Sequence, residues 1–435
     1  MSTDYEPVLL QRRGLDRGQD LDVYERTGGY RALRKAIGAM TPAEVTKEVI
    51  DSNLRGRGGA GFPTGRKWSF IPSDAPVKYL AVNADESEPG TFNNRVFMDA
   101  DPHALLEGIL LCCYAVGIGD AYIYIRGENK AGARMLKRAV AQARERGYVG
   151  RGILGSAFSC EIHVFRGAGA YICGEETALL ESIEGRRPQP RSRPPFPAVV
   201  GLFGKPTVIN NVETLGCVSY VIDRGAAWFK SIGPENAPGP KLYCLSGHVE
   251  RPDVYERPMG TPLRELIEEH AGGVAAGRGL GFVIPGAAAS TALLPAEIDV
   301  AMEYDALRKA GTELGAGGIM VFDDTVCIVD ALARLARFFR HESCGKCVPC
   351  REGTVWQHII LERIAAGNGR PDDLVKLRQV SEQIGGKTLC ALGDFAASPP
   401  QGALRKFPEH FAAHLLGGCP LTNPVTSPIT STGAP

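Results

Sequence analysis

The chain has 435 residues, 44% hydrophobic and 23% charged, and is therefore long enough for two or three globular domains, each with its own core. Its 49 basic and 49 acidic side chains balance, which argues against an overall electrostatic attraction to nucleic acid or to an anionic membrane. The longest uncharged apolar stretch, 108–119, is too short to span a bilayer, and the N-terminus lacks the pattern of a signal or transit peptide. We therefore expect a cytoplasmic protein, in which a tight group of cysteines indicates metal or redox chemistry.

Strand-like and helical segments alternate through the first half of the chain. A helix is predicted over 41–53, with Thr41 as N-cap, Pro42 at its first position and Glu44 closing a capping box. Strands are expected at 77–84, 121–127 and 159–167, with helices near 102–117, 128–146 and 174–184. This alternation predicts a largely parallel, helix-covered sheet in a first domain, residues 1–240. The proline-rich segment 185–206 is expected to wrap over that domain as a loop.

Two further domains are expected after the loop at 233–240. A hairpin followed by a short helix indicates a small α+β domain over 241–325. From 326 to 420 the pattern predicts a bundle of four helices, at 328–341, 353–367, 372–386 and near 401–416. The tail, 421–435, has the composition of a disordered segment.

Three cysteines, Cys344, Cys347 and Cys350, stand at intervals of three residues where the first bundle helix meets the second. Such a run suits one face of a cuboidal iron-sulfur cluster, and Cys390, after the third helix, is the natural fourth ligand. Zinc is the alternative, although structural zinc sites more often use two separate cysteine pairs. The cysteines in apolar runs are expected to be small buried hydrophobes: Cys112, Cys113, Cys217, Cys244 and Cys327.

The segment "LRGRGGAGFPTGRKW", residues 54–68, combines five glycines with four basic side chains. Glycines allow the backbone to approach a phosphate closely, and the basic groups balance its charge. The loop follows a helix, whereas the common dinucleotide fingerprint follows a strand, so it is not that motif. A nucleic-acid-binding RGG tract is the alternative interpretation.

Acidic and polar side chains follow two of the predicted strands. The first strand leads into "NADESEPGTF", with Asn83, Asp85, Glu86 and Glu88, and the third leads into "RGAGAYICGEE", with Tyr171, Glu175 and Glu176. Acidic residues at a helix start are commonly no more than partners of the helix dipole. Two such groups at strand ends, together with the basic glycine loop, indicate a pocket for a phosphate and for sugar hydroxyls or an amide.

Five motifs together resemble the family of NADH-binding flavoprotein subunits of respiratory complex I. They are "RGRGGAGFPTGRKW", "NADESEPGTF", "GAGAYICGEETALLESIEG", "KPTVINNVETL", and "ESCGKCVPCREGT" with "TLCALGD", in the family's order. The resemblance runs from about residue 28 to 415. It implies a Rossmann-like FMN- and NADH-binding domain, a small ubiquitin-like β-grasp domain, and a helical bundle that holds one 4Fe-4S cluster.

The resemblance also implies the residues of each site. FMN would lie against Gly56, Arg57, Gly58, Lys67, Asn83, Asp85, Glu86, Ser87, Gly174, Glu175, Asn210, Asn211 and Thr214, and Gly59 and Gly61 are further expected cofactor-binding residues. NADH would stack over the flavin with Phe62, Phe70, Tyr171 and Phe196, and Glu88, Glu176 and Arg193 would meet its polar groups. Glu88, Glu176 and Tyr171 are the expected catalytic residues, and the cluster ligands would be Cys344, Cys347, Cys350 and Cys390.

The expected activity is hydride transfer from NADH to FMN, followed by single-electron transfer to the cluster and on towards quinone. The family implies two partners, a small thioredoxin-like 2Fe-2S subunit and a large multi-cluster iron-sulfur subunit. It also implies a peripheral position on the cytoplasmic side of the inner membrane, without membrane insertion or nucleic acid. Three alternatives remain: a diaphorase subunit of an NAD-linked hydrogenase or formate dehydrogenase, an iron-sulfur nucleic-acid enzyme, and a non-catalytic scaffold subunit.

Overall fold

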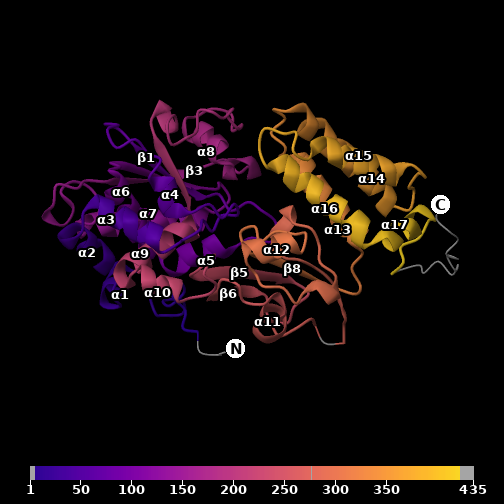
Figure 1. Ribbon diagram of the computed structural model, residues 1–435, viewed down its shortest axis with the longest axis horizontal. Helices are drawn as coiled ribbons and strands as arrows, with labels where there is room; N and C mark the ends of the chain where they lie inside the picture. The colour runs from indigo at the N-terminus through magenta and orange to yellow at the C-terminus, as the bar shows by residue number, and fades with distance from the viewer. Residues whose placement is uncertain (1–4, 276, 422–435) are drawn as a thin grey trace.

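Two four-stranded sheets and a C-terminal group of helices make up the part of the chain that the structure, a computed structural model, describes: residues 5–275 and 277–421 (Figure 1). The predicted fold class is confirmed, with a parallel α/β sheet, a small mixed-sheet unit and C-terminal helices. The domain limits 1–240, 241–325 and 326–420 remain predictions. The predicted disordered tail falls, except for Leu421, outside the described residues.

The first sheet has the strand order β3-β2-β1-β4, and every neighbouring pair is parallel. The three predicted strands are present as β1 (Tyr79–Ala84), β2 (Asp120–Ile125) and β3 (Glu161–Arg166). The fourth, β4 (Thr207–Asn211), was not predicted, because five residues that end in two asparagines give a weak strand signal. Since all four strands run the same way, their carboxyl ends share one edge.

Helices pack on both sides of this sheet. The predicted capping box is present in α3 (Pro42–Asp51), where Thr41 Oγ1 accepts from the Glu44 backbone N–H at 3.3 Å. α6 (Pro102–Val116) and α9 (Val212–Arg224) cross closely at Gly108, where a Cβ atom would lie 1.9 Å from the Leu215 carbonyl oxygen. The other elements of this part are α1 (Leu21–Arg26), α2 (Arg31–Ala39), α4 (Thr64–Trp68), α5 (Asn93–Ala100), α7 (Lys130–Glu145), η1 (Ile153–Gly155), η2 (Tyr171–Gly174), α8 (Glu176–Ile183), η3 (Leu202–Gly204) and α10 (Ala226–Lys230).

The second sheet has the order β6-β5-β8-β7. Its central strands are parallel and both outer strands are antiparallel to their neighbours, which is the arrangement of a β-grasp unit. The predicted hairpin is β5 with β6. The elements are β5 (Pro240–Gly247), β6 (Asp253–Pro258), α11 (Leu263–Glu265), η4 (Leu266–His270), β7 (Leu280–Ile284), η5 (Ala287–Ala289), η6 (Pro295–Glu297), α12 (Tyr304–Lys309) and β8 (Gly318–Asp323).

Five helices form the C-terminal part of the described chain, one more than predicted. The first three predicted helices are present as α13 (Ile328–Glu342), α14 (Val348–Ala365) and α15 (Asp373–Ile384), and α14 begins five residues earlier than predicted, so that Cys350 lies within it. The single helix predicted near 401–416 is wrong, since the chain forms α16 (Leu392–Lys406) and α17 (Pro408–Leu415) instead. Pro399 and Pro400, which normally disfavour a helix interior, lie inside α16, and the break comes at Phe407.

The bundle extends from the second sheet so that one of its ends faces α8 of the first part (Figure 1). The loop between α13 and α14 lies at this end, because Arg187 and Gln189 of the proline-rich segment donate to its Cys344 carbonyl oxygen at 3.2 Å each. The proline-rich segment therefore contacts the bundle as well as the first domain. Among the helices of the described residues, none has both the length and the apolar character needed to cross a membrane.

Candidate functional site

The carboxyl edge of the first sheet gathers most of the predicted FMN residues. In the β1–β4 register Val82 pairs with Asn210 and Asn83 with Asn211, so the two strands end together. Asn83 Nδ2 donates to the Gly174 carbonyl oxygen at 2.9 Å, which brings the loop after β3 to the same edge. The Asn210 side chain is fixed by the Trp68 indole N–H at 2.9 Å.

The glycine loop lies against the turn between β4 and α9. A Cβ atom at Gly58 would lie 3.0 Å from the Asn211 Cβ, so the loop backbone approaches this strand end closely. The Arg57 backbone N–H donates to Thr214 Oγ1 at 2.8 Å. The Arg57 side chain is fully buried, and its Nε and Nη1 atoms have no hydrogen-bond partner among the described residues. The third guanidinium nitrogen, Nη2, donates to the Pro238 carbonyl oxygen at 2.6 Å, so Nε and Nη1 are the donors left for a ligand. Two such buried donors beside a glycine loop fit a phosphate group.

The other face of the loop rests on the second domain. Tyr304 donates its hydroxyl to the Gly56 carbonyl oxygen at 2.7 Å, and its ring lies 4.2 Å from the guanidinium carbon of Arg55. Gly61 has a φ of +63°, and a Cβ atom there would lie 2.8 Å from the Tyr304 ring. No local pattern pointed to Tyr304, because this contact joins residues 248 positions apart.

The acidic turn after β1 serves two different purposes. Glu86, at φ +45°, accepts from the backbone N–H groups of Asn94 at 2.6 Å and Arg95 at 2.9 Å, so it caps the first turn of α5. Asp85 accepts from the Ser87 hydroxyl through Oδ2, whereas its buried Oδ1 has no partner among the described residues. Burial raises the pKa of Asp85 and of Glu86 to about 7. Asp85 is therefore the better placed of the two to accept hydrogen bonds from a flavin.

Glu88 lies between three parts of the fold. It accepts from the Tyr171 hydroxyl at 3.3 Å and from the Ala289 backbone N–H, in the second domain, at 2.9 Å. Burial raises its pKa to about 7, and the hydrogen bonds from the Ala289 backbone N–H and the Tyr171 hydroxyl oppose this shift. The Tyr171 ring packs at 5.2 Å from Phe338 and 6.4 Å from Phe339, both on α13. Tyr171 therefore packs towards the bundle.

Three of the four aromatic residues predicted to contact NADH have solvent-exposed rings. Phe62, Phe70 and Phe196 are 41%, 51% and 57% exposed. Phe62 and Phe70 lie close together, with ring centroids 6.1 Å apart. The rings of Phe62, within the glycine loop, and of Phe70, just after it, fit stacking on the planar parts of a nucleotide.

Two neighbouring glutamates at the start of α8 differ in environment. Glu175 is the helix N-cap and accepts from two backbone N–H groups of the first turn, at 2.9 and 2.8 Å, so its structural role is clear. Glu176 instead forms an ion pair with Arg193 at 2.6 Å and approaches Lys67 Nζ at 3.7 Å. Its charge is thus balanced by two cations, both among the predicted nucleotide-binding residues.

The four predicted cluster cysteines converge. Cys344, Cys347, Cys350 and Cys390 line one cavity, whose other walls contain no histidine or carboxylate from the described residues. Burial raises the pKa of Cys350 to about 11 and of Cys390 to about 12, so a bound cation must displace protons from these thiols. Four thiols from a continuous triple and one remote residue fit a 4Fe-4S cluster.

The short segment η2 joins the two sites. Its Gly174 carbonyl accepts from Asn83 at the sheet edge, while the Ile172 side chain lines the cysteine cavity. The Tyr171 backbone N–H donates to Glu342, the last residue of α13, at 2.9 Å. One four-residue segment therefore spans from the predicted flavin edge to the predicted cluster.

Comparison with known proteins agrees with this layout. The family model described as the Nuo51 FMN-binding domain matches residues 49–220, the SLBB domain matches 241–311, and the NADH-ubiquinone oxidoreductase-F iron-sulfur binding region matches 330–414. The second NADH-quinone oxidoreductase F subunit of Rhizobium meliloti is 55% identical over 412 residues, which cover 94% of this chain and 98% of that protein. The chain belongs to the family of NADH-quinone oxidoreductase F subunits. Another relative, the F subunit of Mycobacterium bovis, is 52% identical over 403 residues, covering 91% of this chain and 90% of that protein.

This F-subunit family member is also similar to a solved structure from another kind of enzyme. The crystal structure of an NAD⁺-reducing [NiFe]-hydrogenase in the H2-reduced state matches with a TM-score of 0.82 and 34% sequence identity. The match covers 94% of this chain and 67% of the hydrogenase chain. The predicted family is thus confirmed, and the fold is shared with a hydrogenase that reduces NAD⁺.

Proposed function

We infer that this chain oxidises NADH as the flavoprotein subunit of a complex I-type NADH-quinone oxidoreductase, with FMN and one 4Fe-4S cluster as its cofactors. The observation that carries the inference is the placement of a glycine loop and strand-end carboxylates at one end of η2 and four convergent cysteines at the other. Family membership supports the same activity.

When bound, FMN supplies the chemistry that takes two electrons from NADH as a hydride and releases them one at a time. We propose that Arg57 and the glycine loop hold its phosphate, and that Asp85 Oδ1, the unpaired acceptor, binds a hydroxyl or N–H of the flavin. Phe62, Phe70 and Phe196 would stack on the nicotinamide or adenine ring and exclude water from one side.

Glu88 and Glu176 are proposed to orient NADH through its polar groups. Glu88, with its pKa raised to about 7, is held in place by the Tyr171 hydroxyl and the Ala289 backbone N–H, and its carboxyl group can retain a proton near neutral pH. Glu176 is held by Arg193 and faces the ligand as part of an ion pair. We propose that the remaining residues predicted for FMN and NADH also contact these ligands.

The electron acceptor is proposed to dock on an apolar groove between α14 and α15. Val348, which is 58% exposed, and Trp356, which is 55% exposed, line the groove together with Ile384. Val348 stands between the proposed ligands Cys347 and Cys350, so a carrier bound here lies beside the cluster. An iron-sulfur protein with an apolar docking face suits this surface, and we assign it to the large multi-cluster subunit.

As a relative of the F subunits, the chain belongs to a multisubunit assembly. We propose that its other neighbour is the small 2Fe-2S subunit, and that the assembly holds the chain on the cytoplasmic side of the inner membrane. The likeness to the NAD⁺-reducing hydrogenase favours a second candidate, a diaphorase subunit with the same chemistry and a different acceptor. Co-purification of the native partners separates the two: iron-sulfur and quinone-reducing subunits indicate complex I, and hydrogenase subunits indicate the diaphorase.

The test of function is NADH oxidation by the purified, FMN-loaded chain, with ferricyanide as electron acceptor and without membranes. We expect activity that depends on FMN and is lost in Arg57→Ala. A properly folded, flavin-loaded protein that does not oxidise NADH would overturn the proposal and leave a scaffold role.

A further inference from the structure

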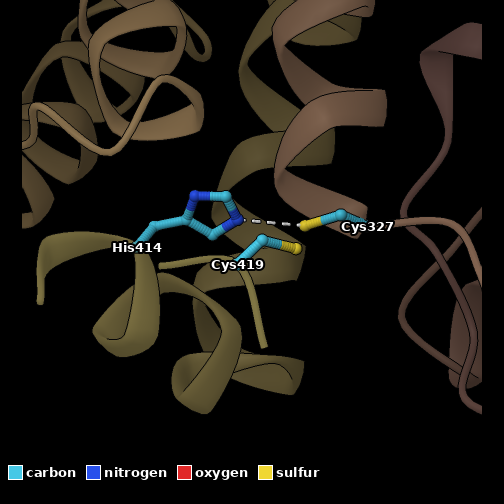
Figure 2. Close-up of side chains that lie close together, drawn as sticks. All are labelled: Cys327, His414 and Cys419. Carbon is cyan, nitrogen blue, oxygen red and sulfur yellow. Dashed lines mark hydrogen bonds between the residues drawn. The ribbon is translucent and has the colours of Figure 1, made fainter. Parts of the chain in front are cut away.

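A second group of potential metal ligands lies at the base of the bundle, in the side chains of Cys327, His414 and Cys419 (Figure 2). Cys327 precedes α13, His414 is in the last turn of α17, and Cys419 follows that helix. α13 has 15 residues, about 22 Å of helix, and leads from Cys327 to the cluster cysteines at its other end. The group is therefore distinct from the iron-sulfur site.

The three donor atoms are spaced as one cation requires. Cys327 Sγ lies 3.2 Å from His414 Nε2, and the three donor atoms all lie within 4.8 Å of one another. In a tetrahedral zinc site the usual bond lengths place sulfur about 3.6 Å from nitrogen and about 3.8 Å from the second sulfur. Small side-chain rotations are enough to reach that geometry. In Figure 2 the Nε2 atom and both sulfurs face a common point.

The histidine is held in the orientation that a metal ligand needs. His414 Nδ1 lies 3.1 Å from the Ile364 carbonyl oxygen, which can only accept, so Nδ1 carries the proton. The lone pair of Nε2 then points towards the sulfurs. A backbone carbonyl bound to the far ring nitrogen is the usual support of a metal-binding histidine. Cys327 and His414 are both buried, 4% and 2% exposed, which shields such a site from water on that side.

A metal-free alternative explains only part of the group. Burial raises the pKa of the Cys327 thiol to about 12, so an unliganded Cys327 remains protonated and can donate to His414 Nε2. This hydrogen bond accounts for two side chains and gives no reason for Cys419, a half-buried cysteine beyond the last helix, to lie beside them. The prediction that Cys327 is a small buried hydrophobe is right about its burial and incomplete about its contacts.

We propose that Cys327, His414 and Cys419 bind one Zn²⁺ ion, with water in the fourth position. Two thiolates balance the charge of the cation, and both thiol protons leave on binding. The bound ion fixes α17 and the chain after it to the N-terminal end of α13. Because it lies at the opposite end of α13 from the cluster cysteines, the ion takes no part in electron transfer.

The test uses the full chain purified without oxygen, with FMN and the iron-sulfur cluster in place, from zinc-supplemented medium. Metal analysis should find about one zinc and about four iron atoms per chain. Cys419→Ser should lose the zinc and keep the iron, whereas the control Cys160→Ser, at a buried cysteine outside both sites, should keep both. X-ray absorption at the zinc edge should show two sulfurs at about 2.3 Å and lighter ligands at about 2.0 Å.

Stability measurement provides a second readout. A chelator should lower the melting temperature of the wild type and of Cys160→Ser, and should leave Cys419→Ser unchanged. Four sulfurs around the zinc would place the ion at the cluster cysteines and overturn the proposal. Zinc retained in both Cys419→Ser and His414→Gln, zinc absent from the wild type, or a Cys327–Cys419 disulfide in the anaerobic protein would each do the same.

Discussion

Gly61→Ala is the most informative single change to the glycine loop. Gly61 has a φ of +63°, and an added Cβ atom would lie 2.8 Å from one Tyr304 ring carbon and 3.0 Å from two others. The ring cannot move freely, since its hydroxyl holds the Gly56 carbonyl at 2.7 Å. The loop must therefore shift away from the position in which we expect it to hold FMN.

Two costs contribute, and a control separates them. A left-handed conformation costs a non-glycine residue roughly 1–2 kcal/mol, and forcing an extra carbon into a packed site costs about 1–3 kcal/mol. Gly311, at φ +73° with no atom within 4 Å of its would-be Cβ, experiences the first cost alone. The second cost should appear as weaker FMN binding, by roughly 5- to 150-fold.

The assay is a titration of apo-protein with FMN, followed by quenching of flavin fluorescence, with the melting temperature of each apo-protein measured in parallel. We expect Gly311→Ala to lose some stability and keep the wild-type dissociation constant, and Gly61→Ala to lose affinity as well. Equal FMN affinity in Gly61→Ala and Gly311→Ala would show that the contact of the loop with Tyr304 does not shape the flavin site.

Three further predictions concern charge. Glu176→Gln removes a charge that repels the 2′-phosphate of NADPH, and it breaks the 2.6 Å ion pair of Arg193, which keeps only its longer contact with Glu175 at 3.3 Å. The Michaelis constant for NADPH should therefore fall by roughly tenfold or more relative to that for NADH, and an unchanged ratio in a flavin-loaded variant would contradict this. Lys241 pairs with Glu213 at 2.7 Å, and both side chains are fully buried. Lys241→Met leaves a buried carboxylate without its cation, so it should lower the free energy of unfolding, measured with denaturant, by about 3–5 kcal/mol, and the double variant Lys241→Met with Glu213→Gln should regain much of the lost stability. A loss below about 1 kcal/mol in Lys241→Met would refute this prediction. Burial raises the pKa of Asp85 to about 7, so the folded apo-protein binds more protons than the unfolded chain between about pH 4 and 7, and its stability falls as the pH rises through that window. Asp85→Asn should therefore raise the melting temperature of the apo-protein at pH 8 and raise it much less at pH 5, and an equal change at both values would argue against a buried, protonated Asp85.

Features that depend on neighbouring residues could be predicted from the sequence. The capping box at Thr41 and Glu44 and the strands that precede Asp85 and Tyr171 all follow from local patterns, and the structure contains them. Cys390 is far from the cysteine triple along the chain, yet the helical pattern between them was enough to predict that it returns to the same end of the bundle.

Features that depend on distant contacts could not be predicted. Tyr304 reaches the glycine loop from another domain, and β4 is held in its sheet by pairing with β1 more than by its own composition. α16 tolerates Pro399 and Pro400 because the surrounding helices bury both residues, which overrides their local preference. The approach of Cys419 to Cys327 likewise depends on how α17 packs, and nothing in either local sequence indicates it.

The central claim is that one chain takes electrons from NADH and delivers them to a cluster held by Cys344, Cys347, Cys350 and Cys390. Its most direct test is an anaerobic NADH titration of the FMN-loaded chain, followed by flavin absorbance and by EPR at low temperature. We predict that the flavin bleaches and a reduced-cluster signal appears in the wild type, and that Cys390→Ser keeps the bleaching and loses the signal. Flavin bleaching with no cluster signal in a wild-type chain that contains about four iron atoms would contradict the claim.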